Sequence, residues 1–224
     1  MKIISLNLKQ DYTQVLTATI EVLKKGGVIV YPTDTIYGLG VNACDYRAVE
    51  QIFKIKKRTL TKPLPIIARN INWVKELAYV PPKLEKFLAK IWPGSVTIIL
   101  PKKDIIPSLV TANRKNIGIR IPDFEFTDKL MGKFGYSLTA TSANISGETN
   151  EESSRNPKKI IEAFQNQLWK PDLILDAGIL PKSLPSTILD LSTIQPKILR
   201  VGQTKPAQLM EILGLDKKTY SKRS

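Results

Sequence analysis

Hydrophobic residues recur at the spacing of an amphipathic helix in three parts of the chain. The first part runs from Thr13 to Lys25, and the glycine pair that follows ends the helix. A further short helix is expected after Gly202. The apolar faces of the three helices are formed, in chain order, by Leu16, Ile20 and Leu23; by Val49, Ile52 and Phe53; and by Leu84, Phe87, Leu88 and Ile91.

Short apolar runs rich in β-branched residues predict strands between these helices. Val28 to Tyr31 is such a run, directly after the first helix. Strands that alternate with helices are typical of an α/β domain with a mixed sheet. The other expected strands are Leu64 to Ala68, Val96 to Leu100, Ile117 to Ile121, Tyr136 to Ala140, Leu173 to Asp176, Thr187 to Leu191 and Ile198 to Val201.

The length of 224 residues suits one domain, residues 1–224, that can bury most of the surface of its unfolded form. We expect the core of this domain to span about residues 13–213. A basic tail, residues 214–224, is too short to form a second domain.

Lysine supplies most of the positive charge of the chain. There are 34 Lys and Arg against 20 Asp and Glu, which gives a net charge of +14. This balance favours anionic partners such as nucleotides, RNA or an acidic membrane surface, but a Lys-rich solvated surface has the same composition. No apolar run is long enough to cross a bilayer, and the N-terminus has no signal-peptide pattern. We therefore expect a cytoplasmic protein without a membrane partner.

The sequence contains no histidine and a single cysteine, Cys44. Ser-His-Asp, Cys-His and His-zinc chemistries are thereby excluded, as is an internal disulfide. Any catalysis must rest on Lys, Arg, carboxylates, hydroxyls, backbone groups or a metal held by oxygen.

Five polar segments lie next to the predicted strands and could carry chemistry. Residues 32–40, in a loop that leads into the second helix, hold two threonines, a tyrosine and two glycines. They offer hydrogen-bond donors and room for close backbone approach to a ligand, although an ordinary turn has the same residues. Lys56-Lys57-Arg58 ends the second helix. Lys56 and Arg58 share a target only if the helix stops there, and otherwise offset the helix dipole.

The other three segments place small polar groups or an arginine at strands. In Ile117 to Pro122, alternation puts Gly118 and Arg120 on the face opposite the isoleucines, where an arginine suits a carboxylate or a phosphate. A solvated edge strand gives the same pattern. Residues 139–147, and residues 185–190 with 199–202, place small polar residues at strand ends, where α/β folds bind ligands, although a structural turn explains either segment alone. No Walker or Rossmann phosphate loop is present. Together the segments predict a pocket of hydroxyls and cations for a multiply anionic substrate.

These segments together resemble the YrdC/TsaC family, the threonylcarbamoyl-adenylate synthases. Residues 32–40 match the PT[DE]TxYGLG signature in full, Lys56-x-Arg58 matches the KxR element, and Ser142-x-Asn144 matches the SxN element. The similarity runs from about Gly26 to Gly202. Further elements recur in the same order, namely Pro63-Leu64, Trp92-Pro93-Gly94, Arg120-x-Pro122, Ser186-Thr187 and Leu199-Arg200-x-Gly202.

The resemblance implies a twisted, open α/β sheet, flanked by helices, with a concave basic face. It also implies that L-threonine, bicarbonate and ATP give threonylcarbamoyl-adenylate and pyrophosphate, with Mg²⁺. The product would pass to a tRNA threonylcarbamoyl transferase complex, and tRNA itself is a candidate partner. By matching position, threonine would be bound by Thr35, Arg120, Ala140 and Ser186; ATP by Arg58, Lys62, Asn116, Ser142, Asn150 and Arg200; and the catalytic set would be Lys56, Arg58, Ser142 and Asn144.

The sequence departs from the family pattern at three places. Ile67 stands where many members carry a histidine beside the threonine end of the pocket, and Thr59 replaces the proline that usually follows the arginine of the KxR element. The usually glycine-rich approach to Ser186-Thr187 is Lys182-Ser183-Leu184-Pro185 here. Longer members also have a C-terminal domain over the site, so a lid is expected from this chain's own loops or its basic tail.

Two other functions remain as alternatives. One is a non-catalytic RNA-binding module, which the net charge of +14 favours, although no RNA-reading signature is visible. The other is a carbamoyl-adenylate-forming relative within hydrogenase-maturation proteins. Such proteins carry a cysteine-rich zinc module, and this sequence has one cysteine.

Overall fold

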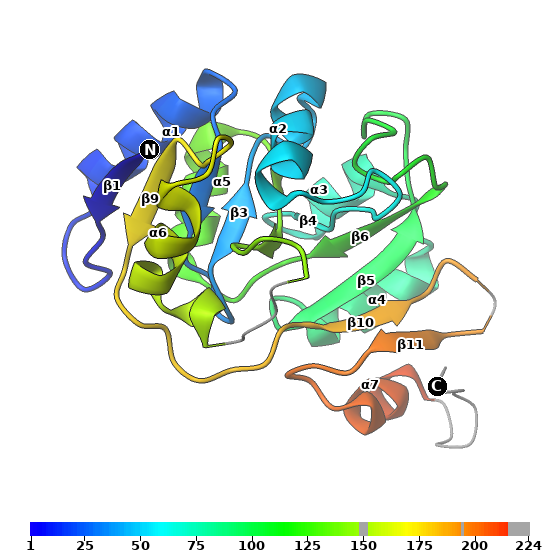
Figure 1. Cartoon of the computed structure of the whole chain (residues 1–224). Helices are drawn as coiled ribbons and strands as arrows, with labels where there is room; N and C mark the ends of the chain where they lie inside the picture. Colours follow the sequence, from blue (N-terminus) through cyan, green and yellow to red (C-terminus); the bar gives the residue numbers. More distant parts are fainter. Residues whose placement is uncertain (148–151, 194, 215–224) are drawn as a thin grey trace.

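The computed structural model describes residues 1–147, 152–193 and 195–214. Their strands form two open, mixed sheets with helices on the outside (Figure 1). The predicted α/β class with mixed strand directions is confirmed, and the strands are divided between two sheets.

The first sheet has the order β1-β9-β2-β3-β8. Its strands β1, β9 and β2 are parallel, while β2, β3 and β8 are antiparallel neighbours. The bounds are β1 (Lys2–Ser5), β9 (Leu173–Asp176), β2 (Ile29–Tyr31), β3 (Gly38–Gly40) and β8 (Thr141–Ser142).

The second sheet has the order β11-β10-β5-β6-β4-β7, in which antiparallel and parallel pairs alternate. It meets the first sheet where β7 runs into β8, and an isolated bridge pairs Asn42 with Leu138 at this junction. The bounds are β11 (Lys197–Arg200), β10 (Thr187–Asp190), β5 (Val96–Pro101), β6 (Asn116–Arg120), β4 (Ile66–Ile67) and β7 (Leu138–Thr139).

Strand β2 separates two cores, which explains why its sequence is apolar without a break. Val28, just before it, and Val30 pack into the core that includes α2 (Tyr46–Lys56) and α6 (Pro157–Gln165). Ile29 and Tyr31 pack into the other core, with α1 (Thr13–Lys24) and α5 (Glu125–Phe134). All four side chains are fully buried.

The remaining helices cover the second sheet. Helix α4 (Pro82–Ile91) packs against both α3 (Ile71–Leu77) and α7 (Pro206–Leu213), and a 3₁₀ turn, η1 (Ser153–Arg155), precedes α6. No helix in the described part of the chain is both long and apolar enough to span a bilayer.

The predicted helices and strands are found, with two differences. Residues 32–40 do not lead directly into the second helix, because Gly38–Gly40 forms strand β3, which two glycines disguise in the sequence. The strands expected at Leu64 to Ala68 and Tyr136 to Ala140 shrink to two residues each, β4 and β7. The structure also adds β1, β8, α3, α5 and α6 to the expected elements.

Candidate active site

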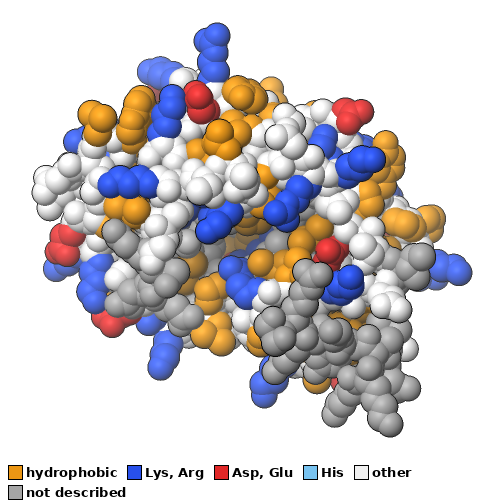
Figure 2. All heavy atoms as spheres, turned by 45° about the vertical axis from the view of Figure 1, so that its right-hand side comes forward, with side chains coloured by type: hydrophobic (Ala, Val, Ile, Leu, Met, Phe, Trp, Pro, Cys, Tyr) orange, Lys and Arg blue, Asp and Glu red, His pale blue; other side chains and the backbone are white. Residues whose placement is uncertain are grey.

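A cavity of about 340 Å³ lies between the two sheets and brings most of the predicted site residues together. Arginine and hydroxyl side chains dominate its polar lining. Figure 2 shows Lys and Arg side chains around a hollow on this face of the molecule, as the expected concave basic face requires. The predicted residues that line the cavity are Thr35, Arg58, Arg120, Ala140, Ser142, Asn144, Ser186 and Arg200.

Arg120, at the end of β6, is held by groups from both sides of the cavity. Its Nε donates to the main-chain oxygen of Gly94 at 2.9 Å, and its Nη1 donates to the hydroxyl of Thr35 at 3.0 Å. Nη2 donates to Oδ2 of Asp34 at 2.6 Å and to the hydroxyl of Ser95 at 3.4 Å. Arg120 is therefore a buried, oriented cation at the cavity wall and not a solvated arginine of an edge strand.

The loop between β2 and β3 is shaped by its own hydroxyl groups. The Thr33 hydroxyl donates to the main-chain oxygen of Ile36 at 2.7 Å and accepts from the main-chain N–H of Thr35 at 3.1 Å. Ser183, from the segment that departs from the family pattern, donates to the main-chain oxygen of Thr35 at 2.6 Å. Thr35 is thereby fixed beside Arg120, with its side chain in the cavity lining.

The two glycines of this loop make room for a buried ring, which differs from the expectation that they admit a ligand. A Cβ on Gly40 would lie 2.5 Å from the Tyr31 ring, and one on Gly38 would lie 2.9 Å from it. The Tyr37 phenol is also engaged within the protein, since it donates to Gly178 and accepts from the N–H of Ala177. The signature therefore serves packing as much as binding.

Lys56 lies behind the cavity. It is the last residue of α2, and its side chain is 1% exposed. Its Nζ donates to the main-chain oxygens of Ser142 and Asn144, at 2.5 and 2.7 Å, and to Oδ1 of Asn144 at 3.2 Å. The SxN loop is thus anchored to the end of α2, and Ser142 and Asn144 are placed in the cavity lining by this anchor.

Arg58 turns toward the cavity because α2 stops at Lys56. Lys57 caps the helix in the left-handed conformation, at φ 50°, which reverses the chain. The guanidinium of Arg58 then donates to the main-chain oxygens of Lys62 and Pro63 at 3.2 and 2.9 Å. The helix therefore ends where a shared target for Lys56 and Arg58 requires it to end, but only Arg58 lines the cavity.

Ser186 and Arg200 form another wall of the cavity. The Ser186 hydroxyl lies 2.8 Å from the hydroxyl of Thr97, a bond in which either group can donate. Arg200 donates from Nε to the main-chain oxygen of Ser186 at 3.0 Å and from Nη2 to its hydroxyl at 3.2 Å. This wall therefore offers two hydroxyls and one guanidinium.

Like charges are held close together around the cavity. Burial, and then the positive charge of Arg58, lowers the pKa of Lys56 to about 7. Partial burial, and then the charge of Arg120, lowers the pKa of Arg200. No Asp or Glu lines the cavity among the described residues. The fold holds these cations close together despite their mutual repulsion, and no carboxylate lines the cavity. This arrangement is typical of a site that binds an anion.

Besides Lys56, two predicted site residues in the described part of the chain do not line this cavity. Lys62 is exposed in the loop after Arg58, and the Asn116 side chain donates to the hydroxyl of Ser192 at 2.9 Å instead. Asn150 lies outside the described residues, as does the tail from residue 215 onward.

Sequence reasoning missed Asp34, Thr97 and Ser183. Asp34 lies inside the recognised signature, and an acidic residue next to an arginine-rich pocket could have been suspected as its counter-ion. Thr97 was readable as the polar residue in the strand Val96 to Leu100. The contact of Ser183 with Thr35 joins segments far apart in the sequence, so no local pattern could have indicated it.

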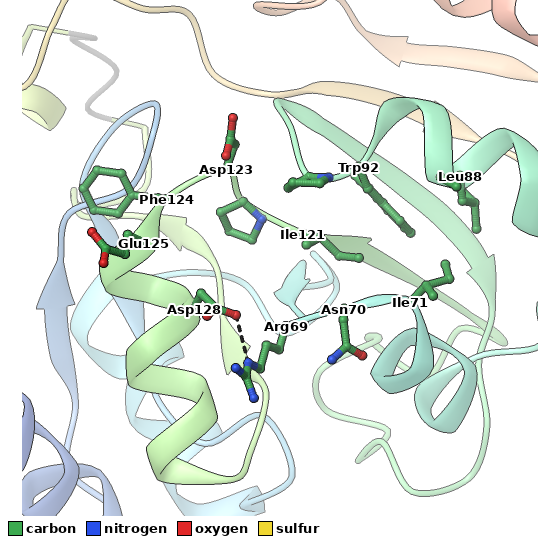
Figure 3. Close-up of a pocket in the computed structure, with 13 residues that line it drawn as sticks. Arg69, Asn70, Ile71, Leu88, Trp92, Ile121, Asp123, Phe124, Glu125 and Asp128 are labelled. Carbon is green, nitrogen blue, oxygen red and sulfur yellow. Dashed lines mark hydrogen bonds and ion pairs between the residues drawn. The ribbon is translucent and has the colours of Figure 1, made fainter.

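A second, larger cavity of about 480 Å³ has a different chemistry. Figure 3 shows apolar side chains such as Leu88, Trp92 and Ile121 together with carboxylates on and before α5. Its arginine, Arg69, donates from Nε to Oδ1 of Asp128 at 2.8 Å. Because carboxylates outnumber cations here, this cavity does not suit a multiply anionic substrate, and the smaller cavity is the candidate site.

Comparison with known proteins places the chain in a family. A family model for Sua5/YciO/YrdC proteins, described as telomere recombination, matches residues 21–202. The chain belongs to this family. Every cavity-lining segment named above lies within the matched range.

Named relatives of the Sua5/YciO/YrdC family match most of this chain. A threonylcarbamoyl-AMP synthase from Pyrococcus abyssi is 32% identical over 193 residues, which are 86% of this chain and 55% of the relative. One from Buchnera aphidicola subsp. Baizongia pistaciae is 34% identical over 192 residues, which are 84% of this chain and 97% of the relative. The chain therefore spans about half of the Pyrococcus protein and nearly all of the Buchnera protein.

A solved structure supports the same assignment. The crystal structure of P. abyssi Sua5 complexed with L-threonine has a TM-score of 0.87 with this chain at 29% sequence identity. The match covers 96% of this chain and 61% of that one. The two-sheet architecture is therefore that of a Sua5/YciO/YrdC protein.

Proposed function

We propose that this protein is an L-threonylcarbamoyladenylate synthase, a nucleotidyltransferase that converts L-threonine, bicarbonate and ATP to threonylcarbamoyl-AMP and pyrophosphate. The observation that carries the proposal is the convergence of Arg58, Arg120 and Arg200, with several hydroxyls, on one cavity without a lining carboxylate. The names of the Pyrococcus and Buchnera relatives support it.

The reaction suits a site without histidine. The threonine amine attacks the carbon of bicarbonate, and loss of water leaves a carbamate. A carbamate oxygen then attacks the α-phosphorus of ATP, and the bond to the β-phosphate oxygen breaks to release pyrophosphate. The threonine carboxylate, the carbamate and the triphosphate concentrate negative charge in one place. Fixed positive groups that stabilise this charge, and alignment of the reacting atoms, supply the rate enhancement.

The lining residues can be assigned to the two larger substrates, threonine and ATP. Arg120, Thr35, Ala140 and Ser186 all line the cavity and would bind threonine, and Arg120 and Thr35 are hydrogen-bonded to each other. Arg58, Ser142 and Arg200 would bind ATP, in accord with the family pattern. Ile67 lines the cavity without a polar atom, so threonine would be bound here without a side-chain hydrogen bond at this position.

Mg²⁺ would enter with ATP and not as a resident ion. The described residues contain no group of three or more Cys, Asp or Glu side chains that could hold a metal. Asp34, the carboxylate next to the cavity, is engaged by Arg120. Mg²⁺ is commonly held by substrate phosphates and water, with few protein ligands.

A cytoplasmic location and delivery of the product to a tRNA threonylcarbamoyl transferase complex complete the proposal. The adenylate is an activated mixed anhydride, so a second enzyme must use it before water does. Direct contact with tRNA would fit the net charge of +14.

Pyrophosphate release from ATP tests the proposal. We expect release that requires both L-threonine and bicarbonate, with threonylcarbamoyl-AMP identified by mass spectrometry in freshly quenched samples. ATP turnover that is independent of threonine and bicarbonate would contradict it. RNA binding with a steep salt dependence and no ATP turnover would favour the RNA-binding alternative instead.

A further inference from the structure

The ion pair between Asp34 and Arg120 differs from the other ion pairs among the described residues. Its side chains are 13% and 8% exposed, and Nη2 of Arg120 lies 2.6 Å from Oδ2 of Asp34. Each of the other pairs has at least one partner that is more than a third exposed. Exposed ion pairs contribute little to stability, whereas breaking a buried ion pair leaves an uncompensated buried charge and is strongly destabilising.

The pair joins the two sheets beside the cavity. Asp34 lies in the loop between β2 and β3 of the first sheet, and Arg120 ends β6 of the second sheet. Together with Gly94, Ser95 and Thr35, Asp34 accounts for four of the five guanidinium N–H groups. These four bonds leave one N–H of Nη1 unused, and Arg120 lines the cavity.

The side chain of Asp34 binds Arg120 and does not cap the local turn. An aspartate that caps a turn accepts hydrogen bonds from nearby backbone N–H groups. Among the described residues, Oδ2 of Asp34 accepts from Arg120, and its buried Oδ1 has no hydrogen-bond partner. The turn is instead held by the hydroxyl of Thr33.

We propose that Asp34 is a positioning residue for substrate binding, which fixes the guanidinium of Arg120 so that its remaining N–H faces L-threonine. This inference rests on the proposed function, because it takes threonine as the ligand of Arg120. A free arginine side chain has many rotamers, and ordering it on binding weakens affinity. Asp34 orders it beforehand, so its effect is specific to threonine and not to ATP.

Three variants at position 34 test this inference by steady-state kinetics with threonine and ATP varied separately. For Asp34→Ala we expect a rise of at least tenfold in KM for threonine and a change of less than twofold in KM for ATP. Asp34→Asn keeps an acceptor without the charge, so a smaller rise is expected. Asp34→Glu keeps the charge and is expected to restore most of the threonine affinity.

The matched control is Asp128→Ala. Asp128 also pairs with an arginine through Nε at 2.8 Å, but at the other cavity (Figure 3). Its loss is expected to leave both KM values unchanged. Thermal melting of every variant separates loss of folded protein from loss of threonine binding.

The outcomes distinguish the inference from the proposed function. A wild-type protein without threonine-dependent turnover would overturn both. An active wild type with unchanged or lower threonine KM in Asp34→Asn and Asp34→Ala would overturn the inference alone. Parallel rises in both KM values would make the pair a structural link between the sheets and would also overturn it. If Asp34→Ala does not fold, Asp34→Asn against Asp34→Glu decides by the same criteria.

Discussion

Nζ of Lys56 donates to both the main-chain oxygen and the side-chain Oδ1 of Asn144, so one buried amine fixes the backbone and the side chain of the same residue. The hydroxyl of Ser142 donates to that Oδ1 as well, at 2.5 Å. With the oxygen of Ser142, Lys56 has three acceptors, which match the three N–H groups of an ammonium. Lys56 thus acts on the cavity through the SxN loop that it holds.

The stability of the protein is predicted to depend on pH through Lys56. Burial and Arg58 lower its pKa to about 7 in the folded chain, while the unfolded value is 10.5. Between these values the unfolded chain binds the extra proton, so the free energy of unfolding rises with pH, by up to about 1.4 kcal/mol per pH unit. Below pH 7 both states hold the proton and the contribution is constant.

Urea unfolding of wild type and Lys56→Met at pH 6, 7.5 and 9 measures this contribution. We expect the difference in unfolding free energy between the two proteins to move in favour of wild type as pH rises. Parallel pH profiles would show that the amine does not titrate in this range.

Arg58→Ala is predicted to reduce kcat/KM for ATP on the order of 10²–10³-fold, because a charge that stabilises the reacting phosphate is lost. The fold is expected to survive, since the side-chain hydrogen bonds of Arg58 within the described part of the chain go to the main-chain oxygens of Lys62 and Pro63 in its own loop. Circular dichroism and pyrophosphate release measure the two effects. Lys57→Ala is the control, because Lys57 is exposed and does not line the cavity. Similar activity in both variants would remove Arg58 from the site.

Arg120→Lys is predicted to be as damaging as loss of the side chain, although the charge is kept. The guanidinium makes bonds to four different residues in a fixed plane, and an ammonium has three N–H groups on a single atom. We expect at least a hundredfold loss of kcat/KM for threonine, measured by threonine-dependent pyrophosphate release. Activity within tenfold of wild type would mean that charge alone is needed.

Gly40→Ala is predicted to destabilise the fold by about 1–3 kcal/mol, because the new methyl group overlaps the ring of Tyr31 in a packed core. Gly132→Ala is the contrast. In helix α5 the atoms nearest to its methyl group would belong to the exposed side chain of Arg69, which can move, so a gain of about 0.5–1 kcal/mol is expected. Chemical denaturation of both variants tests the pair, and equal effects would contradict this account of the signature glycines.

The elements with a buried face were predictable from the sequence, because burial determines the spacing of their apolar residues. Helix α1 and strand β2 were found where the spacing of apolar residues predicted them. Strand β1 was not expected, since three of its four residues are exposed and its pairing partner β9 is distant in sequence. Strand β3 was hidden because two glycines have low strand propensity, and their close packing against the ring of Tyr31 explains their presence.

The candidate site was predictable as a set of motifs but not as an arrangement. Lys56 and Arg58 lie two positions apart in one motif, yet one holds a loop and the other lines the cavity, because the chain reverses at Lys57. No local pattern records this reversal at a lysine, since glycine is the residue usual there. The contact of Asp34 with Arg120 likewise exists only once the two sheets are joined.

The pairing of β1 with β9 determines when the first sheet can form during translation. Lys2 and Ile3 are translated long before Leu173 and Ile174, with which they are in register. Strand β2 also needs β9 as its parallel neighbour, because β9 lies between β2 and β1. The first sheet can therefore form only after β9 has been translated, and until then its earlier strands are exposed to mispairing or to chaperones.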